Sequence, residues 1–314
     1  MKVIEHLQKS NNPILSFEIV PPPRGRSVQD IVDIVEQISP FNPAFIDVTS
    51  HSAHARYQET PGGAITKRVF KKRPGTIGIC GIIQNRFKID TVAHLLCNGF
   101  TKEETEDALI ELNFLGVHNI LALRGDETNH QKIISADRST NRYAADLVKQ
   151  VMEIKAGIFL DELENARPHD FGIGVAGYPE KHFESPNKKA DIKFTKEKVL
   201  AGAEYIMTQM FFDNIHYFEY VAGCRAEGIT VPVIPGIKVI QSTSQLKTIP
   251  KNFYIDFPDS IVDEIGANPK HVKEIGKAWT LKQCEELLNK KIPCLHFYIM
   301  NDASAVVEII KKLF

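Results

Sequence analysis

The sequence predicts an α/β protein, a single (β/α)8 TIM barrel over residues 1–314, and two observations support that prediction. Short runs of β-branched and aromatic residues alternate with longer segments of helical period along the chain, as in successive βαβ units with parallel strands. No stretch rich in Pro, Gly or Ser divides the chain in half. Eight such units without a break favour a closed barrel over an open doubly wound sheet.

The expected elements follow from this alternation. Strands are expected at residues 14–20, 44–50, 92–97, 118–125, 171–177, 205–211, 231–237 and 294–300. Amphipathic helices are expected near residues 27–38, 102–115, 142–153, 189–201, 214–227, 269–289 and 302–313. Ser27, Thr101 and Asp213 stand where N-cap residues are expected, just before three of these helices.

Two segments fit the alternation less simply. Residues 73–87 carry β-branched residues and three glycines, so propensity alone allows a strand, whereas the strand count of a barrel requires a helix. Residues 154–169 are longer than a crossover loop needs. We expect a helical extension or an excursion of the chain there.

Composition excludes several classes of protein. Hydrophobic residues make up 43%, charged residues 25%, and the net charge is −1, which is typical of a globular protein without a basic field for nucleic acid. The sequence shows neither an apolar leader nor a membrane-length apolar run, so we expect no membrane segment and a cytoplasmic location.

Cysteines and histidines give no sign of a disulfide framework or a metal site. The five cysteines are scattered and mostly lie in apolar stretches, so we expect reduced core residues. His51 and His54 lack a third ligand and the spacing of a zinc site, and HExxH does not occur. We therefore expect no metal.

In a parallel barrel, functional side chains gather at the carboxyl ends of the strands. Polar or glycine residues stand at or near these ends: Glu18, Thr49, Ser50, His94, Arg124, Gly125, Asp126, Tyr178, His182 and Gln209. Six strands contribute, so these residues are expected to converge on one mouth.

Glu18 is the strongest candidate for acid chemistry. It lies between Phe17 and Ile19 in a strand expected to be buried, where burial would raise its pKa and make it a proton donor near neutral pH. The alternative is that Glu18 points outward and pairs with a Lys or Arg.

For other candidate residues a purely structural role is also possible. Arg124-Gly125-Asp126 follows an apolar strand and is either a surface turn with an Arg–Asp pair or a place where a planar ligand approaches the backbone. His94 and His182 have apolar neighbours, and a lone histidine in such a place is more often a hydrogen-bonded core residue than a ligand.

A glycine motif in the fifth strand is not expected to bind a nucleotide. Gly172, Gly174 and Gly177 fit G-x-G-x-x-G, but the motif lies inside a strand, and YPEKH rather than a helix follows it. Without a helix N-terminus there is no dipole for a pyrophosphate. We interpret these glycines as positions of close packing.

A set of ordered segments resembles one protein family. SFEIVPPPRG, VAHLLC, NILALRGD, RYAADLV, VAGYPEKHFES, ADIKFTKEKVLAGAEYIMTQMFFD and IPGI together resemble the methylenetetrahydrofolate reductases over roughly residues 14–300. The resemblance implies a barrel with bound FAD that reduces 5,10-methylenetetrahydrofolate to 5-methyltetrahydrofolate with NADH or NADPH, by ping-pong hydride transfer, for methionine biosynthesis. It also implies a homo-oligomer of the short form, without an appended regulatory domain.

The resemblance assigns roles to individual residues. Glu18 resembles the acid that protonates folate N10, Asp126 the carboxylate between flavin and pterin, and Gln209 the amide that binds folate or nicotinamide. The matching flavin contacts are His94, Arg124, Gly125, Asp126, Tyr143, Ala144, Tyr178, His182, Asp191 and Lys198. Thr49 and Gln245 match contacts to the nicotinamide nucleotide, and Ser50 and Ser52 belong to the same cofactor-binding segment.

Three positions depart from the family pattern. Ser50 replaces a Tyr, Ile249 replaces a Phe that covers the folate, and Asp302 replaces an Arg. Two alternatives stay open, and Ser50 and Asp302 suggest the first of them. One is a flavoprotein subunit that takes electrons from a partner protein, and the other is a barrel that binds folate or flavin without catalysis.

Overall fold

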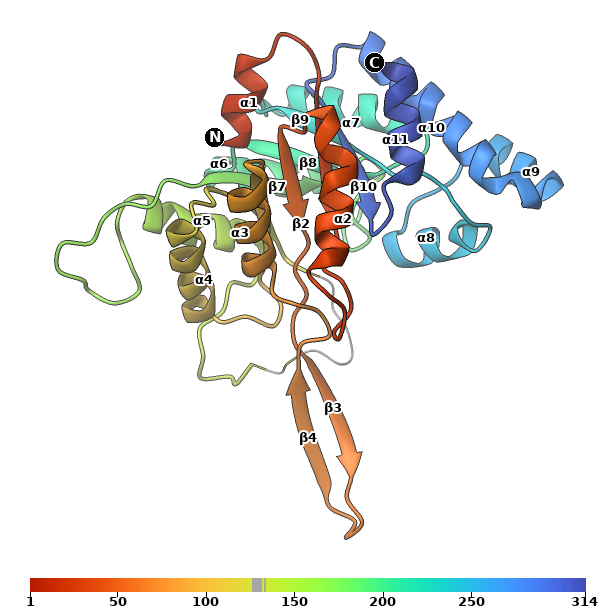
Figure 1. Ribbon diagram of the computed structural model, residues 1–314. Helices are drawn as coiled ribbons and strands as arrows, with labels where there is room; N and C mark the ends of the chain where they lie inside the picture. The colour runs from red at the N-terminus through yellow and green to blue at the C-terminus, as the bar shows by residue number, and fades with distance from the viewer. Residues whose placement is uncertain (126–131, 133) are drawn as a thin grey trace.

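The computed structural model describes residues 1–125, 132 and 134–314; Asp126 therefore lies outside the described residues. Among them, eight parallel strands close into a barrel in the order β1-β10-β9-β8-β7-β6-β5-β2 (Figure 1). These strands are β1 (Ile14–Ile19), β2 (Phe45–Val48), β5 (Asp90–Leu96), β6 (Asn119–Leu123), β7 (Gly172–Gly177), β8 (Tyr205–Met210), β9 (Val233–Ile237) and β10 (Cys294–Met300). The predicted barrel is confirmed.

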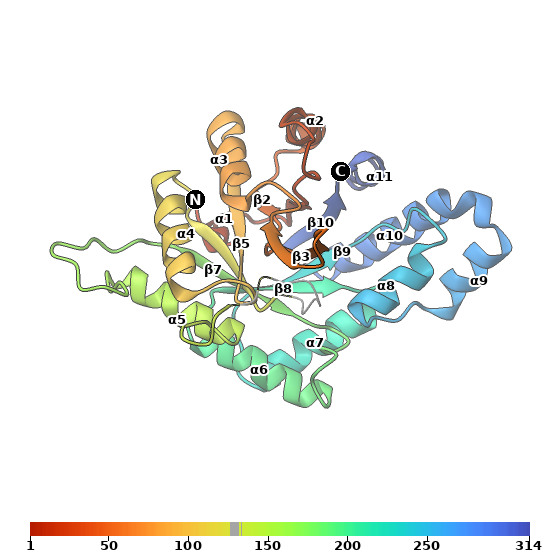
Figure 2. The same ribbon diagram turned by 90° about the horizontal axis from the view of Figure 1, so that it is seen from below.

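Helices surround this barrel (Figure 2). The predicted ones are α2 (Gln29–Ile38), α4 (Lys102–Phe114), α5 (Ala144–Lys155), α6 (Lys188–Leu200), α7 (Asn214–Ala226), α10 (Val272–Asn289) and α11 (Ser304–Leu313). Thr101 caps α4 by accepting from the N–H of Glu104 at 3.2 Å, and Asp213 caps α7 by accepting from the N–H of Ile215 at 3.0 Å. Two of the predicted N-caps are thereby confirmed.

The two ambiguous segments are now resolved. Residues 73–87 contain helix α3 (Thr76–Phe87), which packs on β5 and β2, so barrel topology overrides strand propensity there. Helix α5 ends at Lys155, and Gly157 takes a φ of +79° just beyond it, which ends the helix. The helical extension is wrong, and the excursion is confirmed.

Several elements were not predicted. They are α1 (Val3–Lys9), the antiparallel strands β3 (His54–Glu59) and β4 (Ile65–Phe70), α8 (Gln245–Phe253), α9 (Asp259–Ala267), and the short 3₁₀ turns η1 (Ser39–Phe41) and η2 (Pro269–His271). Strands β3 and β4 form a hairpin that projects away from the barrel (Figure 1). Most of its side chains are exposed, so it lacks the buried face that gives a strand its alternating pattern.

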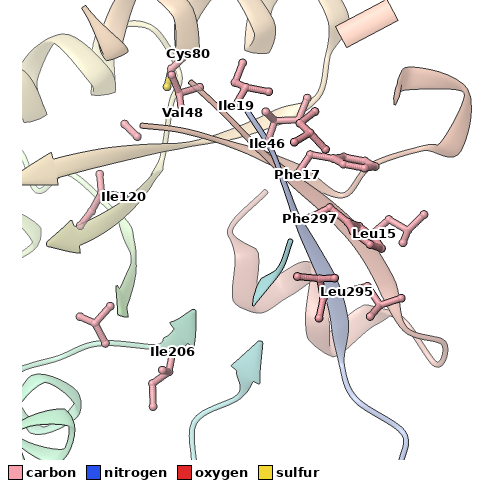
Figure 3. Packing of buried hydrophobic residues seen from close by; sticks show 14 of the residues in the cluster. Leu15, Phe17, Ile19, Ile46, Val48, Cys80, Ile120, Ile206, Leu295 and Phe297 are labelled. Carbon is pink, nitrogen blue, oxygen red and sulfur yellow. The ribbon is translucent and has the colours of Figure 1, made fainter. Parts of the chain in front are cut away.

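Side chains of the barrel strands point alternately toward the surrounding helices and into the barrel. In β1, Leu15, Phe17 and Ile19 belong to the large apolar cluster between barrel and helices (Figure 3). Ser16 instead bonds Nδ1 of His296 at 2.9 Å inside the barrel. Because side chains alternate along a strand, Glu18 shares the inward face with Ser16.

The amino-terminal end of the barrel is closed by α1. Val3 is fully buried in a cluster with Phe45, Val92 and Tyr205. Its N–H donates to Oδ1 of Asn119 at 2.8 Å, and Nδ2 of Asn119 donates to the carbonyl of Met1 at 3.0 Å. This end is therefore filled with apolar side chains and fixed by a side-chain amide.

The glycines of β7 are packing positions, as predicted. A Cβ on Gly174 would lie 2.3 Å from the Tyr205 ring, and one on Gly177 would lie 2.4 Å from the Tyr220 hydroxyl. Residues 178–187 separate β7 from α6, so no helix N-terminus follows the motif directly. The five cysteines are all buried and unpaired.

Candidate active site

Glu18, Asp47 and His94 meet at the carboxyl end of the barrel. They come from the adjacent strands β1, β2 and β5. His94 Nε2 lies 3.3 Å from Asp47 Oδ2 and 3.6 Å from Glu18 Oε2. The exposed fraction of the side chain is 13% for Glu18, 5% for His94 and 0% for Asp47. Glu18 therefore points into the barrel, and the outward alternative is wrong.

Burial sets the protonation of this cluster. It raises the pKa of Glu18 to about 7, with His94 and Lys238 lowering that pKa and Asp47 raising it. Burial also raises the pKa of Asp47 well above its usual range and lowers the pKa of His94. Oδ1 of Asp47 has no hydrogen-bond partner within the described residues. A carboxylic acid with a pKa near 7 can donate a proton at physiological pH.

Two residues beside this cluster were missed by the sequence analysis. Lys238 directly follows β9, and its Nζ donates to the carbonyl of Tyr298 at 2.9 Å. Tyr298 pairs with Glu18 in the register of β10 and β1. Burial lowers the pKa of Lys238 to about 8, against the opposing effects of Glu18 and Asp302. The position of Lys238 after IPGI, at a strand end, was the available signal.

A second polar group lies where β6 and β7 end. Arg124 Nη2 donates to Glu184 Oε1 at 2.7 Å, and its Nη1 donates to the other carboxylate oxygen. His182 Nδ1 accepts from the N–H of Glu184 at 3.3 Å. The rings of Tyr178 and His182 meet edge to face with centroids 4.7 Å apart. Arg124 is therefore bound across the mouth, while the predicted Arg124–Asp126 pair lies outside the described residues.

Helix α6 adds a buried acid and a buried cation to this group. Asp191 Oδ1 accepts from the Ser185 hydroxyl at 2.6 Å, while Oδ2 has no partner in the described part of the chain. Lys198 Nζ donates to the carbonyl of Ala176 and lies 6.0 Å from the centroid of the Tyr178 ring. Burial lowers the pKa of Lys198 to about 8.

Gly125 and its neighbours shape the backbone of this part of the mouth. Gly125 takes a φ of +84°, a conformation that side chains of other residues disfavour. Its carbonyl accepts from Asn98 Nδ2 at 2.8 Å. Ser52 is 9% exposed and fills the space beside Gly99. Thr49 has a buried Oγ1 that finds no partner among the described residues.

Other predicted residues lie elsewhere or are already engaged. Gln209 Oε1 accepts from the N–H of Met210 at 2.9 Å. Gln245 Oε1 accepts from the N–H groups of residues 241 and 242 at the start of α8. Tyr143 is 50% exposed and stands, with Ala144, at the start of α5. Ser50 is half-buried in the loop after β2.

The other two departures from the family pattern have structural partners. Ile249 is 5% exposed and belongs to a separate apolar cluster that includes Ile240, Ile261 and Phe212. Asp302 Oδ1 accepts from the N–H of Ser304 at 2.9 Å. Ile249 therefore packs within the protein.

Within residues 1–125, 132 and 134–314, no group of three or more His, Cys, Asp or Glu side chains is arranged to hold a metal ion. In that same part of the chain, no helix combines the length and apolar character needed to cross a membrane.

The fold and the mouth define the class of protein: a (β/α)8 barrel whose strand ends carry a buried acid, a histidine and several cations. Over residues 2–314 the chain matches the family model described as methylenetetrahydrofolate reductase. It belongs to the methylenetetrahydrofolate reductase family.

Known relatives agree with this assignment. Methylenetetrahydrofolate reductase 1 of Schizosaccharomyces pombe is 32% identical over 305 residues, which cover 95% of this chain and 45% of that protein. The 5,10-methylenetetrahydrofolate reductase of Pectobacterium carotovorum is 27% identical over 302 residues, or 95% of this chain and 89% of that protein. This chain thus spans about half the length of the first of these relatives.

A solved structure shows the same fold. It is an uncharacterized protein from Clostridium thermocellum that binds two copies of 5-methyl-5,6,7,8-tetrahydrofolic acid. The TM-score is 0.60 at 13% identity, with 99% of this chain and 98% of that chain covered. At this identity the likeness supports the barrel and its topology alone.

Proposed function

We propose that the chain reduces 5,10-methylenetetrahydrofolate to 5-methyltetrahydrofolate, with a bound FAD and with NADH or NADPH as electron donor. The observation that carries the proposal is the inward-facing Glu18, 3.6 Å from His94 and with a pKa near 7. Family membership supplies the substrate class. The binding of a methyl-folate by the similar Clostridium thermocellum protein is consistent with it.

Glu18 is the proposed acid. In its protonated form it donates to N10 of the substrate, which opens the five-membered ring and leaves an electrophilic iminium at N5. Asp47 favours the protonated form of Glu18 because it opposes ionisation, while His94 limits the rise of the Glu18 pKa. One hydride delivered to the iminium carbon completes the N5 methyl group, and the one proton given by Glu18 stays on N10 as its N–H.

Residues that follow β2 and β6, together with residues on helix α6, fit an FAD. Asp191 Oδ2 and Thr49 Oγ1 are buried without partners in the described residues. Since buried polar atoms are normally hydrogen-bonded, a ligand can supply the missing partners. Lys198 is a buried cation suited to a pyrophosphate or an anionic ring. Gly125 lets a planar group approach the backbone. The chemistry that a bound FAD supplies is hydride transfer.

The remaining assignments follow the resemblance. Gln209 Oε1 is engaged by Met210, so contact with folate or nicotinamide falls to its Nε2. Asp126 is proposed as the carboxylate between the flavin and the pterin. His94, Arg124, Tyr178 and His182 are proposed to line the flavin. Both substrates use one mouth in turn, which is a ping-pong order.

The direct experiment separates the two half-reactions. The purified chain should show flavin absorbance, lose it on anaerobic mixing with NADH or NADPH, and regain it on addition of methylenetetrahydrofolate. Bleaching by a reduced viologen dye but by neither nicotinamide would instead indicate a flavoprotein subunit fed by a partner protein. Failure of folate to reoxidise flavin reduced by either route would reject the reductase proposal and favour a non-catalytic barrel.

A further inference from the structure

A cavity of about 360 Å³ lies at the rim of the mouth, apart from the groups described so far. Pro23, Arg24, Phe70, Lys72 and Arg73 line it. We call it the rim pocket. It sits between the loop that follows β1 and the base of the β3–β4 hairpin, which leave the carboxyl ends of two adjacent barrel strands.

Backbone contacts hold the two walls of the rim pocket together. The N–H of Arg24 donates to the carbonyl of Lys72 at 2.8 Å. The Arg73 guanidinium donates to the carbonyl of Pro21. Residues 21–23 are three consecutive prolines, which restrict the backbone of this wall. The positions of the cationic side chains therefore rest on an ordered frame.

The charge of the rim pocket has one sign. Of the five lining residues in the described part of the chain, three are cationic and none is acidic. In the wider segments 20–28 and 54–73, basic residues stand at 24, 26, 56, 67, 68, 71, 72 and 73, against the single acidic residue Glu59. Arginine and lysine bind phosphate and carboxylate groups by charge-assisted hydrogen bonds. The pocket is therefore suited to an anion, with Pro23 and Phe70 offering apolar contact.

The rim pocket is connected to the acid site through one short peptide. Pro21 follows Glu18 by three residues, and Arg24 follows it by six. Six residues of extended chain span at most roughly 20 Å. The acid site and the rim pocket therefore lie no more than about 20 Å apart, a distance that a substrate with an extended anionic part can span.

We propose that the rim pocket binds the anionic end of an extended substrate whose reacting end lies beside Glu18. Two substrates of the proposed reaction carry such an end: the glutamate carboxylates of the folate, and the phosphates of the nicotinamide nucleotide. This inference rests on the proposed function for the identity of the substrate. The presence of an anion site can be tested without it.

The site is tested first by binding. The double variant Arg24→Gln, Lys72→Gln removes two cations and leaves Arg73 to hold the loop. The double variant Lys67→Gln, Arg68→Gln, on the exposed hairpin outside the pocket, removes the same charge and is the matched control. Pyrophosphate and tri-γ-glutamate are titrated by calorimetry into the holoprotein. We expect the pocket double variant to bind at least one of them about tenfold more weakly than the control variant does. Equal binding of both probes by the two variants would overturn the proposal, whatever the activity.

The half-reactions then identify the substrate. A raised KM for methylenetetrahydrofolate triglutamate, with a smaller change for the monoglutamate, assigns the pocket to the folate tail. A raised KM for NADH or NADPH in flavin reduction assigns it to the nucleotide. Loss of bound flavin on purification of the pocket double variant, with no change in either KM, would reject an exchangeable substrate as the occupant. An inactive wild-type protein that still binds the probes would refute the proposed function and leave the anion site standing.

Discussion

Buried polar groups at opposite ends of the barrel, Asn119 at one end and Asp47 with Thr49 at the other, differ in whether their hydrogen bonds are satisfied. At the amino-terminal end, Asn119 accepts from the N–H of Val3 and donates to the carbonyl of Met1, so both ends of its amide are satisfied. At the mouth, Asp47 and Thr49 keep buried oxygen atoms without partners in the described residues. A satisfied polar group stabilises the fold, whereas an unsatisfied one costs stability and remains available to a ligand. Asn119 therefore stabilises the fold, whereas the oxygen atoms of Asp47 and Thr49 that lack partners among the described residues mark the mouth as the place where a ligand can bind.

The largest expected effect comes from removing the acid of the mouth. Glu18→Gln keeps the shape but cannot donate the proton, so reoxidation of reduced flavin by methylenetetrahydrofolate should slow about 1,000-fold. Flavin reduction by NADH or NADPH should stay within a few-fold of wild type. Stopped-flow absorbance measures both rates. Equal loss in the two half-reactions would show that Glu18 is not the acid.

Stability measurements on the same variant test the sign of the Glu18 pKa. Because the folded pKa of about 7 lies above the ordinary value of 4.5, the charged form disfavours folding. At pH 8, Glu18→Gln should therefore melt at the same temperature or higher. The gain should shrink as pH falls from about 7 toward 4.5, where the carboxyl is protonated in both states. A large loss of melting temperature at pH 8 would contradict this.

At the opposite end, the expected effect is on folding alone. Asn119→Ala leaves the buried N–H of Val3 without an acceptor, which should lower the free energy of unfolding by about 2 kcal/mol. Denaturation by urea measures this loss, with Asn289→Ala on the exposed end of α10 as control. Rates per folded molecule should stay unchanged. A large fall in either half-reaction would mean that the two ends are not independent.

The smallest expected effect comes from removing the charge of Lys238 beside Glu18. Lys238 lowers the pKa of Glu18, so Lys238→Met should raise that pKa and extend folate reduction to higher pH. Lys238→Arg keeps the charge and should restore the wild-type pH profile. The profile of the folate half-reaction is the measurement, because a purely structural role would change the rate at every pH alike. A shift toward lower pH would reverse the assigned role of Lys238.

The barrel could be predicted because each strand carries its own pattern. Leu15, Phe17 and Ile19 alternate with polar positions, and the same period recurs in other strands. The β3–β4 hairpin could not be found in this way, since it buries little and its residues show no apolar face. Helix α8 contains Pro250, which conceals a helix from propensity. Elements that bury few side chains show little hydrophobic periodicity in the sequence.

The site was predictable where chemistry and strand position coincide. Glu18 and His94 stand near strand ends and were found; their contact across β1, β2 and β5 depends on register, which one sequence does not specify. Asp47 was missed because a single acid inside FIDV resembles an outward-facing residue. Lys238 was missed because one lysine after a strand is common. Only the closed barrel brings these groups together.

Close packing at the glycines of β7 constrains the order in which substitutions can accumulate in this part of the sequence. Gly174 faces the ring of Tyr205 so closely that an added methyl would lie 2.3 Å from it. A larger residue at 174 is therefore tolerated only after the ring at 205 has become smaller, and that order leaves a cavity in the interim. During sequence divergence, residue 205 must therefore become smaller before residue 174 becomes larger, so the two positions should co-vary as a pair.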